Sequence, residues 1–188
     1  MFLALMLAAT PNTPQSPPKL TPAERETVDG REVVVRLTEE DDGSQSLVAI
    51  LDVNAPTGVT LDAVLDVEAR ADEVSALDTV TLYIDTPSQL GADYAFDLPG
   101  YDGNFYILYD VDRARGFAYY AMDTSKENDI DSAAGSYQVF PRGQGTRLVY
   151  RVSIENGGMA PMWVKKALIT RNLPEQLKGM RSRAEAAG

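Results

Sequence analysis

Alternation of apolar and polar side chains dominates the middle of the chain. A period of two predicts strands that bury one face and expose the other. In residues 77–86, for example, Val80, Leu82 and Ile84 are apolar and their neighbours are mostly polar. The segments that follow this pattern are 77–86, 91–100, 104–112, 117–123 and the strand–turn–strand 135–158. The sequence therefore predicts an antiparallel meander of five or six strands.

Two further strands and a short helical region are predicted ahead of the meander. Residues 31–37 and 46–55 are rich in branched apolar side chains, which is typical of strands. In residues 55–74 apolar side chains recur at helical spacing, and Thr60 is a candidate N-cap. We expect one short helix or a pair of helices there.

The period becomes helical near the C-terminus. From Pro161 to Ala184 apolar residues recur every three or four positions, which predicts one long helix with an apolar face. Pro174 is expected to kink this helix, because proline lacks the backbone N–H. A single-faced meander curls, and a long helix is the natural cover for its concave side. The predicted fold is α+β, with a curved antiparallel sheet wrapped around a long C-terminal α-helix.

Residues 1–23 differ in composition from the rest of the chain. Residues 2–9 form an apolar run that ends in small residues, as in the core of a signal peptide. Five of the eleven prolines follow in residues 11–22, which predicts an extended linker. We therefore divide the chain into a signal-like segment with a Pro-rich linker (1–23) and one folded ligand-binding domain (24–188).

The apolar run at residues 2–9 indicates export to the periplasm. It is much shorter than the ~20 residues that span a bilayer, and no Lys or Arg precedes it. If it is a signal, the mature protein begins near Thr10. The alternative is an apolar tail without a function, in which case we expect the protein in the cytoplasm.

Composition narrows the classes of function. The net charge of −11, from 17 basic and 28 acidic residues, argues against a nucleic-acid partner, which requires clustered positive charge. The chain contains no His and no Cys, which excludes Ser-His-Asp triads, thiol nucleophiles and His- or Cys-ligated metals. No cofactor fingerprint is present, and the acidic segment 126–131 reads as a solvated loop rather than a cation site. We therefore expect no cofactor, no metal and no catalytic residue.

Three segments resemble the START-like helix-grip superfamily (also termed SRPBCC), and the similarity covers about residues 30–185. This group includes steroidogenic lipid-transfer domains, plant pollen allergens, polyketide cyclases and coenzyme Q-binding proteins. The segments are "VNAPTGVTLDAVLDV" (53–67), "YILYDVDRARGFAYY" (106–120) and residues 128–177, which carry "GSYQVFP", "GTR" and the helix that opens at Pro161. The leader "EVVVR" (32–36) is similar to that of exported bacterial members.

The resemblance implies a helix-grip fold with an interior that binds apolar molecules between the sheet and the long helix. Only some members perform chemistry there, and no catalytic motif transfers to this chain. The implied function is binding, and by extension transport, of a hydrophobic small molecule such as a lipid or an isoprenoid, with transient membrane contact as an option. The alternatives are a cyclase or aromatase that uses the same interior, and a structural module whose interior is filled by side chains. The sequence does not predict the oligomeric state.

The chain has nine tyrosines, and several fall on predicted inward faces. A buried phenol needs a hydrogen-bond partner, so these rings either line a ligand cavity or fill an ordinary core. Arg171 either anchors a ligand carboxylate or carbonyl, or extends to the rim. The predicted ligand-binding residues are Tyr94, Phe96, Ile107, Tyr109, Tyr119, Tyr137, Leu148, Tyr150, Trp163 and Arg171.

Overall fold

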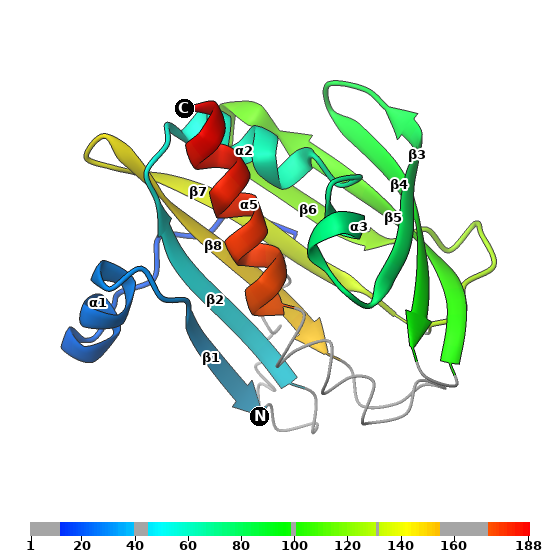
Figure 1. Ribbon diagram of the computed structural model, residues 1–188, viewed down its shortest axis with the longest axis horizontal. Helices are drawn as coiled ribbons and strands as arrows, with labels where there is room; N and C mark the ends of the chain where they lie inside the picture. Colours follow the sequence, from blue (N-terminus) through cyan, green and yellow to red (C-terminus); the bar gives the residue numbers. More distant parts are fainter. Residues whose placement is uncertain (1–11, 40–44, 99–100, 131, 155–172) are drawn as a thin grey trace, which may run out of the picture.

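The computed structural model describes residues 12–39, 45–98, 101–130, 132–154 and 173–188. One antiparallel sheet of eight strands, in the order β1-β2-β8-β7-β6-β5-β4-β3, carries helices α2, α3 and α5 on its concave face (Figure 1). The elements are α1 (Pro22–Asp29), β1 (Val34–Glu39), β2 (Gln45–Val53), α2 (Thr57–Leu65), α3 (Arg70–Glu73), β3 (Leu77–Asp85), β4 (Gln89–Leu98), β5 (Tyr101–Asp112), the 3-10 turn η1 (Arg113–Arg115), β6 (Phe117–Met122), β7 (Ala134–Arg142), β8 (Gly145–Ile154) and α5 (Leu173–Ala187). The predicted α+β class is confirmed.

The meander predicted from the period of two is confirmed in β3 to β8, whose consecutive strands pair antiparallel. In β3, Val80 is buried while Thr79 and Thr81 are exposed, as the alternation requires. Strand β2 pairs with β8 and thereby joins the N-terminal strands to the end of the meander. The result is one continuous sheet with a single apolar interior under the helices.

The two short helices predicted after β2 are α2 and α3, but Thr60 is not the N-cap. Helix α2 begins at Thr57, directly after Pro56. The backbone N–H of Thr60 already donates to the Pro56 carbonyl, at 2.9 Å. Residue type alone suggested Thr60, whereas the helix starts one turn earlier, with Pro56 in the N-cap position and no side-chain cap hydrogen bond.

Helix α5 packs on the concave face through residues three or four positions apart. Leu173, Leu177, Met180 and Ala184 are all buried, and the helix contacts both α2 and α3. Pro174 is the second residue of the described helix. The predicted helix start at Pro161 lies outside the described residues. The turn that precedes Leu173 also lies outside them, so the kink expected at Pro174 stays a prediction.

The N-terminal segment packs against the outer face of the sheet, opposite the helices. A second apolar cluster joins Leu20 and Val28 to Val34, Ile50 and Val149. In the segment predicted as a linker, the backbone N–H of Gln15 donates to the Gln138 side chain at 3.0 Å. The segment runs behind the sheet in Figure 1 before it reaches α1. Residues 12–23 therefore contact the folded domain.

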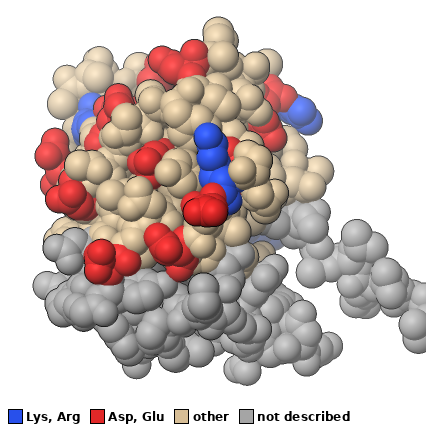
Figure 2. Space-filling view, turned by 90° about the vertical axis from the view of Figure 1, so that its right-hand side faces the viewer, with Lys and Arg blue, Asp and Glu red and all other residues tan. Residues whose placement is uncertain are grey.

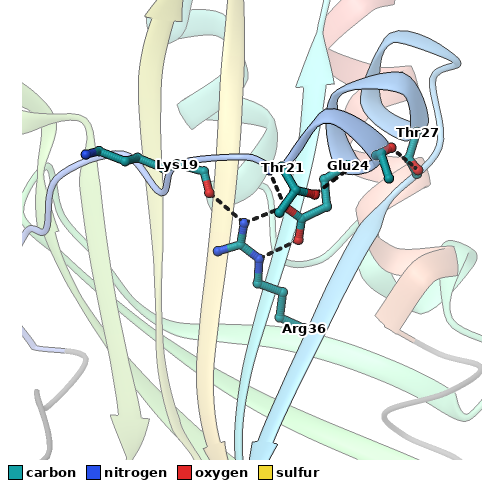
Figure 3. A network of polar contacts seen from close by, with 6 residues as sticks. Lys19, Thr21, Glu24, Thr27 and Arg36 are labelled. Carbon is teal, nitrogen blue, oxygen red and sulfur yellow. Dashed lines mark hydrogen bonds and ion pairs between the residues drawn. The ribbon is translucent and has the colours of Figure 1, made fainter.

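A capping box starts α1 and ties it to β1 (Figure 3). The hydroxyl of Thr21 accepts from the backbone N–H of Glu24, whose carboxylate accepts in turn from the backbone N–H of Thr21. The guanidinium of Arg36 donates to both oxygens of Glu24, at 2.7 and 2.8 Å, and to the carbonyl of Lys19. The "TPAE" sequence was a readable signal for this helix, which the sequence analysis missed.

We expect Glu24 to have a pKa of about 2, because Arg36 and the Thr21 backbone N–H donate to its carboxylate. Its ordinary pKa is 4.5, so this network stabilises the folded protein above that pH and is lost as the pH falls toward 2. An NMR titration of the Glu24 carboxyl checks the value, and Arg36→Gln should return the pKa toward the ordinary one. A Glu24 carboxyl that titrates near 4.5 in the unaltered protein would contradict the network.

No described helix is both long and apolar enough to span a bilayer. Within the described ranges, no group of three or more acidic side chains is placed to hold a metal ion.

Candidate ligand site on the concave face

The structure brings most of the predicted site residues together beneath the helices. Seven are buried on the strands β4, β5, β7 and β8: Tyr94, Phe96, Ile107, Tyr109, Tyr137, Leu148 and Tyr150. All except Phe96 belong to one apolar cluster, and Phe96 contacts Phe105 at its edge, with ring centroids 5.9 Å apart. The rings contact one another: the centroids of Tyr137 and Tyr150, for instance, are 4.7 Å apart.

Tyr119 does not lie with this set. Its cross-strand partners are Asp110 and Ser136, on the outer face, whereas the next residue, Tyr120, faces the interior. The sequence analysis chose the wrong tyrosine because β6 carries apolar side chains on both faces, so alternation alone did not fix its orientation. Tyr120 takes the expected place, with its hydroxyl 2.5 Å from that of Tyr150.

Trp163 and Arg171 lie outside the described residues. The anchoring role predicted for Arg171 therefore stays a prediction.

The main site residue that the sequence analysis missed is Arg70, the first residue of α3. Its side chain is buried, with the residue only 2% exposed. One terminal nitrogen, Nη1, donates to the hydroxyls of Tyr94 at 2.8 Å and Tyr109 at 2.7 Å, and Nη2 donates to the Val64 carbonyl at 2.7 Å. The signal was its spacing, because Arg70 lies three residues after buried Val67 and four before buried Val74.

Arg70 is a buried cation without a carboxylate partner among the described residues. Burial lowers the pKa of Arg70, but its contacts with Tyr109, Tyr94 and Tyr137 raise the pKa by a larger amount. The pKa therefore lies well above the ordinary value, and the side chain stays charged. Its guanidinium carbon is 5.5 Å from the ring centroids of both Tyr109 and Tyr137. Such contacts contribute about 2 kcal/mol when desolvated, which is less than the several kcal/mol that burial of an ion costs.

Hydroxyl pairs connect the tyrosines around Arg70. Tyr94 and Tyr109 share a hydrogen bond of 2.6 Å, as do Tyr120 and Tyr150 at 2.5 Å. Tyr137 accepts from the Gln176 side chain on α5, at 3.3 Å. Each pair of tyrosines has two hydroxyl hydrogens, and the bond between the two hydroxyls uses one of them. The second hydrogen of each pair has no acceptor among the described residues. Around Arg70 the described groups therefore offer more hydrogen-bond donors than acceptors, although Oε2 of Glu73, on the same helix, is buried without a hydrogen-bond partner.

The position of Arg70 is fixed from α5. Arg183 on α5 forms an ion pair with Glu73 on α3, and it also donates to the Ala63 carbonyl at 2.7 Å. Glu73 therefore pairs with Arg183 instead of Arg70. This contact holds α3, and with it the Arg70 backbone, against the C-terminal helix.

An open cleft of about 570 Å³ lies between α2 and the β3–β4 turn. Leu65 and Leu90 line it and also belong to the apolar cluster of the interior, and Leu90 is the cross-strand partner of Tyr109. Asp62, Asp66 and Asp85 line the same cleft. The β3 side of the molecule, shown in Figure 2, presents more acidic than basic side chains. The cleft therefore joins an acidic surface to the edge of the tyrosine cluster.

We expect Tyr94, Tyr120, Tyr137 and Tyr150 to stay neutral far above neutral pH. Burial raises the pKa of Tyr150 to about 12, although the Tyr120 hydroxyl lowers it in part, and burial also raises the pKa of Tyr94, Tyr120 and Tyr137 well above 10. The neutral phenols thus favour the folded state below pH 10, and this stability is lost as the pH rises through about 12.

Ultraviolet absorbance of phenolate measures this titration. Tyr150→Phe should remove one group that ionises near pH 12 and leave the groups that ionise at lower pH unchanged. Complete ionisation near pH 10 with the fold intact would contradict the burial.

Solved structures share this architecture. The Zhui aromatase/cyclase from a Streptomyces species superposes with a TM-score of 0.65 at 18% identity, covering 77% of this chain and 98% of its own. The STAR-related lipid transfer protein from Xanthomonas axonopodis gives 0.62 at 14%, covering 80% and 98%. A START superfamily protein from Mycobacterium smegmatis gives 0.59 at 17%, covering 76% and 99%. No family model and no curated relative matches the sequence. The chain has the START-like helix-grip fold.

Proposed function

We propose that the protein binds a hydrophobic small molecule, of the lipid or isoprenoid kind, between the concave face of the sheet and the C-terminal helix. The observation that carries this proposal is the band of aromatic rings on β4 to β8, whose hydroxyls face one another beneath α5. An interior built only for packing is best filled with apolar side chains, because each buried hydroxyl requires a partner. Phenols combine apolar area with polar groups that can orient a ligand.

The structural neighbours support the same use of the fold, since one is described as a lipid transfer protein and another as an aromatase/cyclase. Binding and carriage fit this chain better than catalysis. The described interior holds phenols with raised pKa and one arginine, and neither provides a base at neutral pH.

A cyclase or aromatase is the second candidate. It is favoured by one observation, the convergence of the Arg70 guanidinium and the hydroxyls of Tyr94 and Tyr109. Such donors stabilise an oxyanion that develops in a transition state. A turnover of a linear polyketide analogue that is abolished by Arg70→Met, with ligand binding retained, would favour this candidate over carriage.

The binding proposal is tested with retinol, a neutral isoprenoid alcohol that absorbs where tryptophan emits. The chain has a single tryptophan, Trp163, so energy transfer to bound retinol reports one place. We expect saturable quenching at one retinol per chain and an increase in melting temperature, as mass action requires.

Two variants locate the retinol. Ala92→Leu adds bulk on the buried concave face and should weaken binding about tenfold through steric overlap. Tyr119→Phe changes the outer face and should leave binding unchanged. Melting curves show that both variants fold. Absence of saturable quenching would indicate a structural module with a filled interior, and unchanged binding in Ala92→Leu would place the retinol elsewhere.

A further inference from the structure

We propose that the ligand carries a carboxylate and that Arg70, with the hydroxyls of Tyr94 and Tyr109, is its anchor. This inference rests on the proposed function above and deepens it. A neutral lipid would be held by apolar contact alone, whereas Arg70 is a buried positive charge that no carboxylate matches among the described residues.

The charge of Arg70 requires an anion. Arginine is almost never fully buried unless it is paired, because a lone buried ion loses its hydration without compensation. The described groups that contact Arg70 are phenols and one carbonyl, and burial keeps the phenols of Tyr94 and Tyr137 neutral at physiological pH. Among the described side chains, the carboxylate on the same helix, Glu73, is engaged by Arg183. A carboxylate from outside the chain would supply the missing charge.

Arg70 also has donors to spare. Its guanidinium has five N–H groups, and the described bonds use three of them. Nε is buried and has no hydrogen-bond partner in the described part of the chain. An arginine edge presents two parallel N–H groups that fit the two oxygens of a carboxylate. One phenol hydrogen of the Tyr94–Tyr109 pair also has no acceptor in the described part of the chain, so the site offers donors to a ligand.

The placement of Arg70 suits a ligand with a charged head and an apolar tail. The Val64 carbonyl holds Nη2, and the Glu73–Arg183 pair holds α3, so the guanidinium is fixed before any ligand binds. Apolar side chains of the same cluster, such as Ile107 and Leu148, are buried on the concave face and are the groups against which the tail would pack. The head would be bound at α3 and the tail beneath α5.

The test compares retinoate with retinol, which differ at the head group and share the isoprenoid tail. At a pH where retinoate is ionised, wild-type protein should bind it about tenfold or more tightly than retinol, as expected for hydrogen bonds to a charged group. Arg70→Met should reduce this ratio to about one by loss of retinoate affinity, with retinol affinity kept within about threefold. Arg115→Met, which removes an exposed arginine of η1, should keep the wild-type ratio.

Arg70→Lys serves as the second variant, since it keeps the charge and loses the two-pronged geometry; it should retain part of the preference. If Arg70→Met does not fold, two other measurements test the anchor. One is the ratio of retinoate to retinol affinity in Arg70→Lys, which should be reduced. The other is the melting temperature of the wild-type protein, which retinoate should increase more than retinol does. The cleft is lined by Asp62, Asp66 and Asp85 and by one basic residue, Arg113, so if retinoate enters there its association should accelerate with added salt, as repulsion is screened. Retinol association should not change.

The outcomes separate the two proposals. Saturable retinol binding without a preference for retinoate overturns the anchor and leaves the binding function standing. A preference that persists in Arg70→Met assigns the carboxylate to another residue and overturns the role of Arg70. Absence of binding by both molecules counts against the binding function and the anchor together.

Discussion

Gly135→Ala is expected to lower the free energy of unfolding by about 3 kcal/mol, the upper range for an overpacked core. A Cβ at this position would lie 2.5 Å from the Arg151 carbonyl and 2.5 Å from the Tyr120 hydroxyl. The carbonyl belongs to the neighbouring strand β8 and cannot withdraw without breaking the sheet. The Tyr120 hydroxyl is bonded to Tyr150, so relief on that side would separate a buried pair. Urea denaturation monitored by circular dichroism measures the loss.

Gly58→Ala is the matched control. Its added Cβ would meet nothing within 4 Å, and Gly58 lies in helix α2. The same chemical change should here stabilise the protein by about 0.5 kcal/mol, because alanine restricts the unfolded chain. Equal losses of stability in Gly135→Ala and Gly58→Ala would contradict this explanation. They would show that the contacts of a Cβ with the Arg151 carbonyl and the Tyr120 hydroxyl do not cause the loss at Gly135. Gly135→Ala should also weaken retinol binding, since it displaces Tyr120.

Leu177→Ala should cost about 3 kcal/mol, within the range measured for fully buried leucines. Leu177 is 0% exposed and lies on the inner face of α5. Its removal leaves a cavity where the helix meets the apolar cluster, and little of that cavity can collapse because strands lie beneath it. The midpoint of urea denaturation should fall without a change in slope.

Leu37→Ala is the control for this truncation. Leu37 lies on the edge strand β1 and is 53% exposed, so the same truncation should change stability by less than about 0.5 kcal/mol. A small effect at Leu177, comparable to that at Leu37, would mean that α5 does not contribute to the core. That result would also remove the cover from the proposed ligand site.

The order and type of most elements could be predicted because their patterns are periodic. Strands β3 to β5 alternate between the buried and the exposed face, so alternation reports them directly, whereas β6 to β8 also bury residues on the outer face. Helix α1 was missed because the surrounding prolines were interpreted as a linker, although Thr21 and Glu24 carry the capping-box signal. Thr60 was misassigned as an N-cap because residue type alone was considered, and Pro56 determines the start of α2.

The site could be predicted only where orientation follows from alternation. Tyr94, Tyr109, Tyr137 and Tyr150 were placed correctly on inward faces. In β6 both faces carry apolar side chains, and pairing with β5 and β7, which is not local in sequence, selects Tyr120 over Tyr119. Arg70 was missed because an arginine between acidic residues is usually solvated. Its burial follows from tertiary contacts with Tyr94 and Tyr109, which are far away in sequence.

The pairing of β2 with β8 has a consequence for the order of folding. The hairpins of the meander close loops of a few residues, whereas the ion pair of Asp52 with Arg147 across this seam joins residues 95 positions apart. Closing so long a loop costs about 2 kcal/mol more entropy than closing a ten-residue hairpin. We therefore expect pulsed hydrogen exchange during refolding to protect the amides of β4 and β5 before those of β2. Simultaneous protection would indicate one concerted nucleus. Sequential protection would mean that the β2–β8 seam is the last part of the sheet to pair.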